Sequence, residues 1–120
     1  MKKLLFMVAL VVTVACAAQA YMHDPIPSAE LTVVNRNLQD VTVYVLRDGQ
    51  RFRLGLVTSM MTTHLHIPGW AMGGERTIRL MGDPIGSPEY VYTELIHVQE
   101  GQRIEWWIET NIDRSSVMVL

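Results

Sequence analysis

Two histidines have the spacing in this chain that most suggests chemistry. His64 and His66 flank Leu65, and in a β-strand residues i and i+2 project from the same face. Two imidazoles on one face supply half of the ligands of a zinc or copper site. Two exposed histidines on a solvent-facing strand explain the same pattern without a metal. We favour that second interpretation because the sequence does not reveal the remaining ligands.

A further metal-binding group depends on where the chain is cut. Ala18-Gln19-Ala20 fits the small-x-small pattern of signal peptidase, so the mature chain would begin Tyr21-Met22-His23. A free amine with histidine in third position can hold copper(II) or nickel(II) in a nitrogen-rich tetragonal site. We favour chance as the explanation, because many mature proteins have a histidine in third position without any function. Lipidation at Cys16, in the loose lipobox Val14-Ala15-Cys16, would instead place the N-terminus elsewhere.

Residues 1–20 have the features of a bacterial secretory signal peptide. Lys2 and Lys3 precede an apolar run over 4–15, which is shorter than the roughly 20 residues that a spanning helix needs. We expect export to the periplasm or beyond the cell. Cleavage after Ala20 is favoured over a lipid anchor at Cys16, the only membrane attachment that we expect.

Export changes the charge of the domain. Loss of the two lysines leaves eight basic and twelve acidic residues, a formal charge of −4. A mildly acidic domain without lysine is a poor nucleic-acid binder, so we expect no nucleic-acid partner. Cleavage after Ala20 also removes the single cysteine. An apolar core must then stabilise the domain without disulfides.

The elements that must position these side chains are strands. Residues 21–29, with prolines at 25 and 27, indicate an extended leader. Residues 30–120 contain short alternating runs bounded by turn residues, the pattern of a single all-β domain. We predict a two-layer antiparallel sandwich of about seven strands, immunoglobulin-like or transthyretin-like, with a small barrel as the alternative. The runs are 31–35, 41–47, 51–57, 61–67, 76–81, 89–98, 103–110 and 116–120.

Asp48-Gly49 predicts a two-residue hairpin turn. Pairing residue 47 with 50 puts Val45 opposite Phe52, Val43 opposite Leu54 and Val41 opposite Leu56, all on the core face. Tyr44 then lies opposite Arg53 on the outer face, where we expect a cation–π contact.

A second hairpin is predicted around 99–102, with Gly101 at positive φ. It would pair Val98 with Ile104 and Ile96 with Trp106. Trp107 would then point outward, opposite in direction to Trp106. Trp70, in a Pro- and Gly-rich loop, is interpreted first as a lid on the core and second as a binding residue.

Four segments resemble small exported bacterial proteins of unknown function. They are Asn35-Arg36-Asn37, residues 40–45, Arg53-Leu54-Gly55 and residues 79–87. The resemblance covers most of the mature chain. It implies a β-sandwich and assigns no activity and no site residue.

The leading hypothesis is a non-enzymatic envelope domain that binds a protein partner or has a structural role. No catalytic or phosphate-binding signature is present in the sequence, and we expect no cofactor. The candidate partner surface comprises Tyr44, Arg53, Trp107 and Trp70. The alternative is a periplasmic copper, nickel or zinc binding protein that uses His64, His66 and His23.

Overall fold

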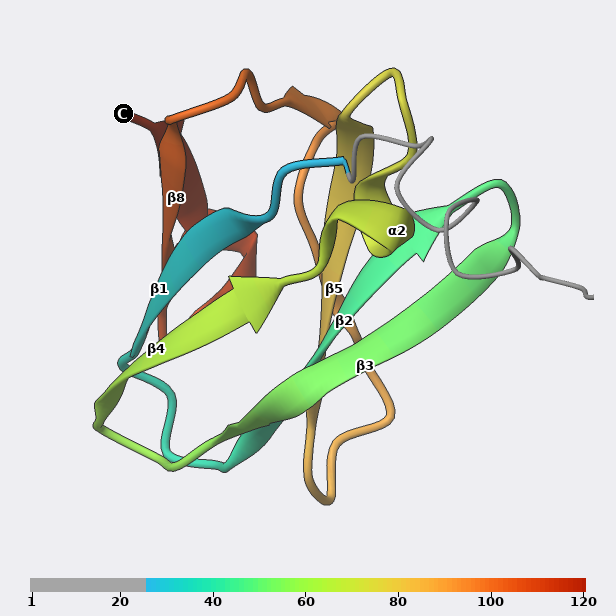
Figure 1. Cartoon of the computed structure of the whole chain (residues 1–120). Coiled ribbons are helices and arrows are strands. Elements are labelled where there is room, and N and C mark those ends of the chain that lie inside the picture. The colour runs from blue at the N-terminus through green and yellow to red at the C-terminus, as the bar shows by residue number, and fades with distance from the viewer. Residues whose placement is uncertain (1–25) are drawn as a thin grey trace, which may run out of the picture.

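The computed structural model describes residues 26–120, which form two β-sheets packed as a sandwich (Figure 1). The predicted signal peptide, most of the predicted leader, Cys16 and His23 lie outside the described residues. The first sheet, sheet A, contains β4, β1, β8 and β9 in that order, and sheet B contains β3, β2, β5 and β6, with β7 paired to β5. The elements are β1 (Ala29–Asn35), β2 (Val41–Arg47), β3 (Gln50–Val57), β4 (Thr62–Ile67), α2 (Gly69–Met72), β5 (Thr77–Pro84), β6 (Val91–Tyr92), β7 (Ile96–His97), β8 (Arg103–Ile108), η1 (Ile112–Arg114) and β9 (Ser116–Val119).

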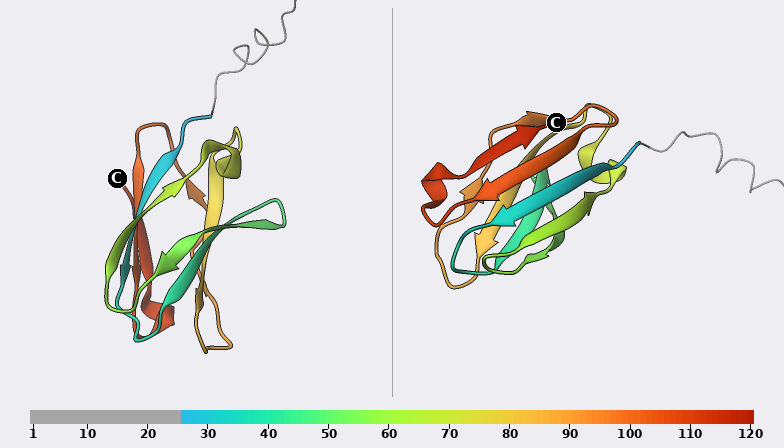
Figure 2. Two further views of the ribbon diagram at one scale, coloured as in Figure 1. Left: turned by 60° about the horizontal axis from the view of Figure 1, so that its bottom comes forward. Right: turned by 90° about the vertical axis from the view of Figure 1, so that its left-hand side faces the viewer.

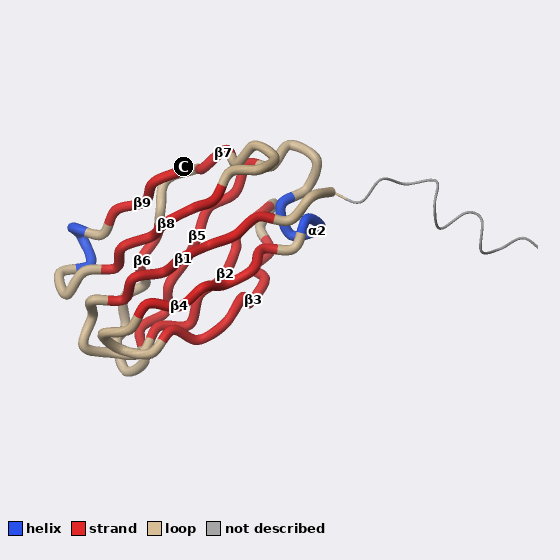
Figure 3. The backbone as a smooth tube through the Cα atoms, turned by 60° about the vertical axis from the view of Figure 1, so that its left-hand side comes forward, coloured by secondary structure: helices blue, strands red, loops and turns tan. Residues whose placement is uncertain are grey.

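The prediction of an all-β sandwich is confirmed, and its strand order can be compared with that of an immunoglobulin domain. An immunoglobulin constant-type domain holds its first, second, fifth and fourth strands in one sheet. Here the first strand pairs with the fourth, and the second pairs with the third and fifth. This order differs from that of a constant-type immunoglobulin domain. Figure 3 shows β9, β8, β1 and β4 as one layer in front of sheet B. One pair departs from the predicted antiparallel pattern, because β1 and β8 run parallel.

Alternation within the strands builds the core between the two sheets. In β1, β2 and β8 every second side chain is buried, while the residues between them are half-buried or exposed. Trp106 is the largest fully buried side chain and lies in this core. A period of two on both sheets is what a sandwich with one solvated face per sheet requires.

The hairpin between β2 and β3 forms with its predicted turn. Asp48 and Gly49 both have positive φ, 53° and 76°, as a two-residue turn that follows the strand twist requires. Arg47 pairs with Gln50 and Val45 pairs with Phe52, as predicted.

The same hairpin departs from the predicted register in its second half. Val43 pairs with Gly55 rather than Leu54, and Val41 pairs with Val57 rather than Leu56. The register shifts between Val43 and Tyr44 because β3 carries an extra residue there, a β-bulge. Val57 therefore enters the core, whereas Leu56 is 44% exposed.

The second predicted hairpin is wrong. Ile96 pairs with Ile78 of β5, in sheet B, whereas Trp106 pairs with Val33 and Val117, in sheet A. The segment between them crosses from one sheet to the other. Its tight turn does form, with the Gln102 amide donating to the Gln99 carbonyl at 3.1 Å and Gly101 at φ 86°. A turn signal fixes a local reversal, but it does not fix which strand the chain meets next.

The predicted strand over 89–98 splits into two short pieces, β6 and β7. Between them the Thr93 hydroxyl accepts from the Leu80 amide at 2.9 Å and donates to the Glu94 carbonyl at 2.8 Å. A side chain that satisfies backbone groups in this way interrupts the ladder. No helix in the described part of the chain is long and apolar enough to span a membrane.

Buried asparagines join the loops at one end of the sandwich. The Asn35 amide donates to the carbonyls of Gln39, Val57 and Thr58 at 3.0–3.3 Å. Asn37 donates to the carbonyl of Glu109 at 3.2 Å. The Asn35-Arg36-Asn37 segment therefore holds the loop after β1 against loops from both sheets.

Candidate functional site

The four residues of the predicted partner surface lie in three separate places. Tyr44 and Arg53 are cross-strand neighbours on the outer face of sheet B. Trp107 belongs to β8 and lies on the outer face of sheet A, on the opposite side of the sandwich. Trp70 lies in α2, near the tip of the β2–β3 hairpin. One continuous surface cannot include all four.

The outer face of sheet B gathers arginine and tyrosine side chains. The Tyr44, Met81 and Tyr92 positions form one row across β2, β5 and β6. Met81 is buried although it points away from the core, so its two tyrosine neighbours cover it. We define the arginine–tyrosine face as Tyr44, Arg51, Arg53, Arg79, Met81 and Tyr92.

The cation–π contact on this face involves a different arginine from the predicted one. The guanidinium of Arg51, rather than Arg53, lies 5.1 Å from the centre of the Tyr44 ring. Arg53 is directly opposite Tyr44 in the register, and Arg51 is the diagonal neighbour. Long side chains reach diagonal neighbours in a sheet as readily as direct ones.

Three arginines of this face have no anionic partner among the described residues. Among residues 26–120, no carboxylate lies within ion-pair distance of Arg51, Arg53 or Arg79. Asp83 and Glu75 lie at the two ends of the face. Positive charge is thus concentrated on one face, although the chain as a whole has a formal net charge of −2.

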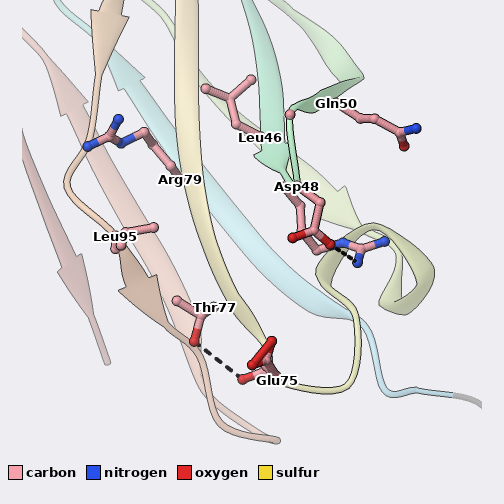
Figure 4. Close-up of a pocket in the computed structure, with 9 residues that line it drawn as sticks. Leu46, Asp48, Gln50, Glu75, Thr77, Arg79 and Leu95 are labelled. Carbon is pink, nitrogen blue, oxygen red and sulfur yellow. Dashed lines mark hydrogen bonds and ion pairs between the residues drawn. The ribbon is translucent and has the colours of Figure 1, made fainter.

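A shallow open depression of about 640 Å³ continues the face toward the hairpin tip (Figure 4). Leu46, Leu95 and Arg79 lie on one side of it, and the Asp48 turn lies on the other. Leu95 is 67% exposed. The depression combines apolar surface with both signs of charge, which suits the side chains of a polypeptide.

Trp70 is not a lid on the core. Its side chain is 62% exposed, while its helix neighbours Ala71 and Met72 are buried. The indole meets the Phe52 ring edge to face, with centroids 5.1 Å apart. Arg47 fixes α2 against the hairpin by donating to the carbonyls of Ala71 at 3.1 Å and Trp70 at 3.2 Å. Trp70 is therefore held in place and open to solvent.

The outer face of sheet A has a different character. The indole of Trp107 donates to the Glu105 carboxylate at 2.8 Å. Arg36 lies 4.5 Å above the Trp107 ring and forms an ion pair with Glu109 at 3.8 Å. Trp107 therefore contacts charged groups of its own chain, and these contacts explain why its side chain points outward.

The two candidate metal ligands also lie on the outer face of sheet A. His64 and His66 project together from β4, as predicted, opposite Thr32 and Glu30 of β1. Nδ1 of His64 lies 2.9 Å from the Thr32 hydroxyl, and Nδ1 of His66 lies 3.2 Å from the Glu30 carboxylate. Within residues 26–120, no three histidine, cysteine or carboxylate side chains gather as a metal-binding group.

Sequence reasoning missed Arg51, Arg79, Tyr92 and Leu95 as members of the site. Alternation does place both arginines on solvent faces, because Arg79 lies between the buried Ile78 and Leu80, and Arg51 precedes Phe52, which packs against the core. What the sequence lacks is the pairing of β2 with β5 and β6, which brings these strands side by side.

Comparison with known proteins indicates neither a family nor a function for this chain. The chain matches no protein-family model, and no curated protein sequence is significantly similar to it. The site must therefore be judged from its own geometry and charge.

Proposed function

We propose that this chain is an exported, non-enzymatic module that binds a protein partner in the cell envelope through its arginine–tyrosine face. One observation carries the proposal: Arg51, Arg53 and Arg79 share a sheet face and have no anionic partner among the described residues. Positive patches of this kind steer and orient acidic partners.

The other residues of the face support a protein partner. Tyrosine and arginine are the side chains that most often dominate binding energy at protein interfaces. Tyr44 and Tyr92 present rigid rings, and Met81 fills the space between them. The neighbouring depression offers Leu95 and Leu46 as apolar surface for a partner side chain.

Export rests on the pattern of residues 1–20, and the resemblance to small exported bacterial proteins adds to it. Intact mass of the mature protein from its host tests this part of the proposal. A chain that begins at Tyr21 indicates cleavage after Ala20, whereas an acylated chain that begins at Cys16 indicates a lipid anchor. A mass that retains Lys2 and Lys3 contradicts export by this signal.

Affinity capture from an envelope extract tests the binding face with two charge-matched variants. The face variant is Arg53→Glu/Arg79→Glu. The control variant, Arg103→Glu/Arg114→Glu, makes the same change of net charge on exposed residues outside the face. We expect the wild type and the control to capture the same protein, and the face variant to capture at least tenfold less. Equal capture by both variants, or no specific capture by the wild type, contradicts the proposal.

A further inference from the structure

The first half of β3 has an open backbone edge. β3 is the outermost strand of sheet B, and its hairpin with β2 projects beyond the sandwich (Figure 2). In a two-residue hairpin the pair that closes the turn, here Arg47 and Gln50, is hydrogen-bonded, and bonded pairs then alternate along the ladder. Val45 and Phe52 form the next bonded pair. The N–H and C=O groups of Arg51 and Arg53 therefore point away from β2.

Nothing in the described part of the chain covers this edge. No backbone hydrogen bond to Arg51 or Arg53 is present besides those of the β2–β3 ladder among residues 26–120. The bulge beyond Arg53 ends the open stretch, and the chain then turns toward β4 in the other sheet. The available edge spans residues 50–54.

The two faces beside this edge differ in chemistry. Arg51 and Arg53 project on the outer side, without anionic partners among the described residues. Phe52 and Leu54 project on the inner side and are only partly buried. Trp70 extends that inner side, since it stacks edge to face on Phe52 and is exposed.

We propose that residues 50–54 of β3 accept an extended segment of the partner as an added antiparallel strand, with alternating acidic and apolar side chains. Carboxylates would lie beside Arg51 and Arg53, and apolar side chains would lie toward Phe52 and Trp70. Strand addition obtains affinity from main-chain hydrogen bonds and specificity from alternate side chains. The inference rests on the proposed function and specifies how the partner binds.

The charge of the edge selects an acidic occupant over a second copy of this chain. Two β3 edges paired antiparallel would bring Arg51 and Arg53 of one copy near those of the other, and like charges across a strand pair repel. Charged side chains on an edge strand prevent such self-pairing. The same two arginines attract an alternating acidic strand.

Synthetic peptides test the binding mode on the mature chain. The probe is an acetylated, amidated octapeptide of alternating Glu and Val, titrated by fluorescence anisotropy. In an antiparallel pair opposite Arg51 and Arg53, the Glu amides face β3 and the Val amides face solvent. We expect N-methylation of the Glu residues to weaken binding at least tenfold and N-methylation of the Val residues to weaken it less than threefold. A peptide with the four Glu and four Val in two blocks should also bind at least tenfold more weakly.

Variants of the chain provide the matched controls. Arg51→Glu/Arg53→Glu should lose the Glu-Val peptide and bind a Lys-Val peptide instead, while Arg103→Glu/Arg114→Glu, with the same change of net charge, should bind the Glu-Val peptide like the wild type. Arg53→Pro removes an edge-facing N–H, which an edge strand tolerates. It should bind the peptide at least tenfold more weakly than Arg53→Ala, which loses the same guanidinium but keeps the N–H, with an unchanged circular dichroism spectrum. Equal binding of all the peptides, or none by the wild type, overturns strand addition.

Capture of the envelope partner by these variants distinguishes a failure of this inference from a failure of the proposed function. A partner retained by Arg53→Pro and lost by Arg53→Glu/Arg79→Glu binds the face and not the edge, which overturns strand addition and leaves the proposed function standing. Loss of the partner in both variants, with retention in Arg53→Ala, supports both. A wild type that captures no envelope protein but binds the Glu-Val peptide contradicts the proposed function and supports the edge as a strand acceptor.

Discussion

The outer faces of the two sheets both carry charged and aromatic residues, but the contacts of these residues differ. On sheet A, Trp107 contacts Glu105 and Arg36, and His66 contacts Glu30. On sheet B, Arg53 and Arg79 contact no carboxylate among the described residues. On the first face these side chains contact oppositely charged or polar groups of the chain itself, whereas Arg53 and Arg79 on the second have no carboxylate partner among the described residues. An outward-pointing aromatic or charged residue is therefore a weak indicator of binding until its partners are known.

Removal of Trp107 should have the largest effect on stability. Trp107→Ala loses a hydrogen bond, a cation–π contact and apolar packing, so we expect the free energy of unfolding to fall by about 2 kcal/mol. Urea denaturation followed by circular dichroism measures the change. The control is Tyr92→Ala, whose ring is 52% exposed on sheet B and should cost only about 0.5 kcal/mol. Equal losses of unfolding free energy in the two variants would contradict the contrast between the two faces.

Charge substitutions on the two faces should differ less in their effect on the free energy of unfolding. Glu105→Gln keeps the size of the side chain but weakens the acceptor of the Trp107 indole, and should cost about 1 kcal/mol. Arg53→Glu reverses a charge that has like-charged neighbours, so its unfolding free energy should stay within about 0.5 kcal/mol of the wild type. Both are read from the same denaturation curves. A loss above 1 kcal/mol in Arg53→Glu would reveal a structural partner for Arg53 and contradict the comparison.

The histidines should give the smallest effect. His64→Ala removes one exposed hydrogen bond to Thr32 and should change stability by about 0.5 kcal/mol or less. Calorimetry with zinc should give a dissociation constant weaker than about 10 µM, unaffected by the substitution. His97→Ala, on β7 of the other sheet, is the matched control. Tighter zinc binding that His64→Ala alone abolishes would make sheet A a metal site.

Much of the local structure could be predicted from the residues. The alternation of β2, the Asp48-Gly49 turn and the outward direction of Trp107 all follow from a period of two and from turn chemistry. The bulge in β3 could not, because an extra residue is accommodated only where the partner strand and the core make room for it. Of the four residues of the predicted partner surface, Tyr44 and Arg53 are neighbours in the structure, but Trp70 and Trp107 lie elsewhere.

Outside the bulge in β3 and the loop of Trp70, the sequence by itself determined which strand side chains face the core, which face outward and where the chain reverses, because these properties depend on residues close together along the chain. Only the tertiary structure decided that the segment after β7 crosses to the other sheet, and that β5 lies beside β2 and brings Arg79 onto the face of Tyr44. Strand partners far apart in sequence are selected by the packing of the whole core. That selection also determines which outward side chains contact a partner within the described chain. It therefore produces the difference between the outer faces of sheet A and sheet B.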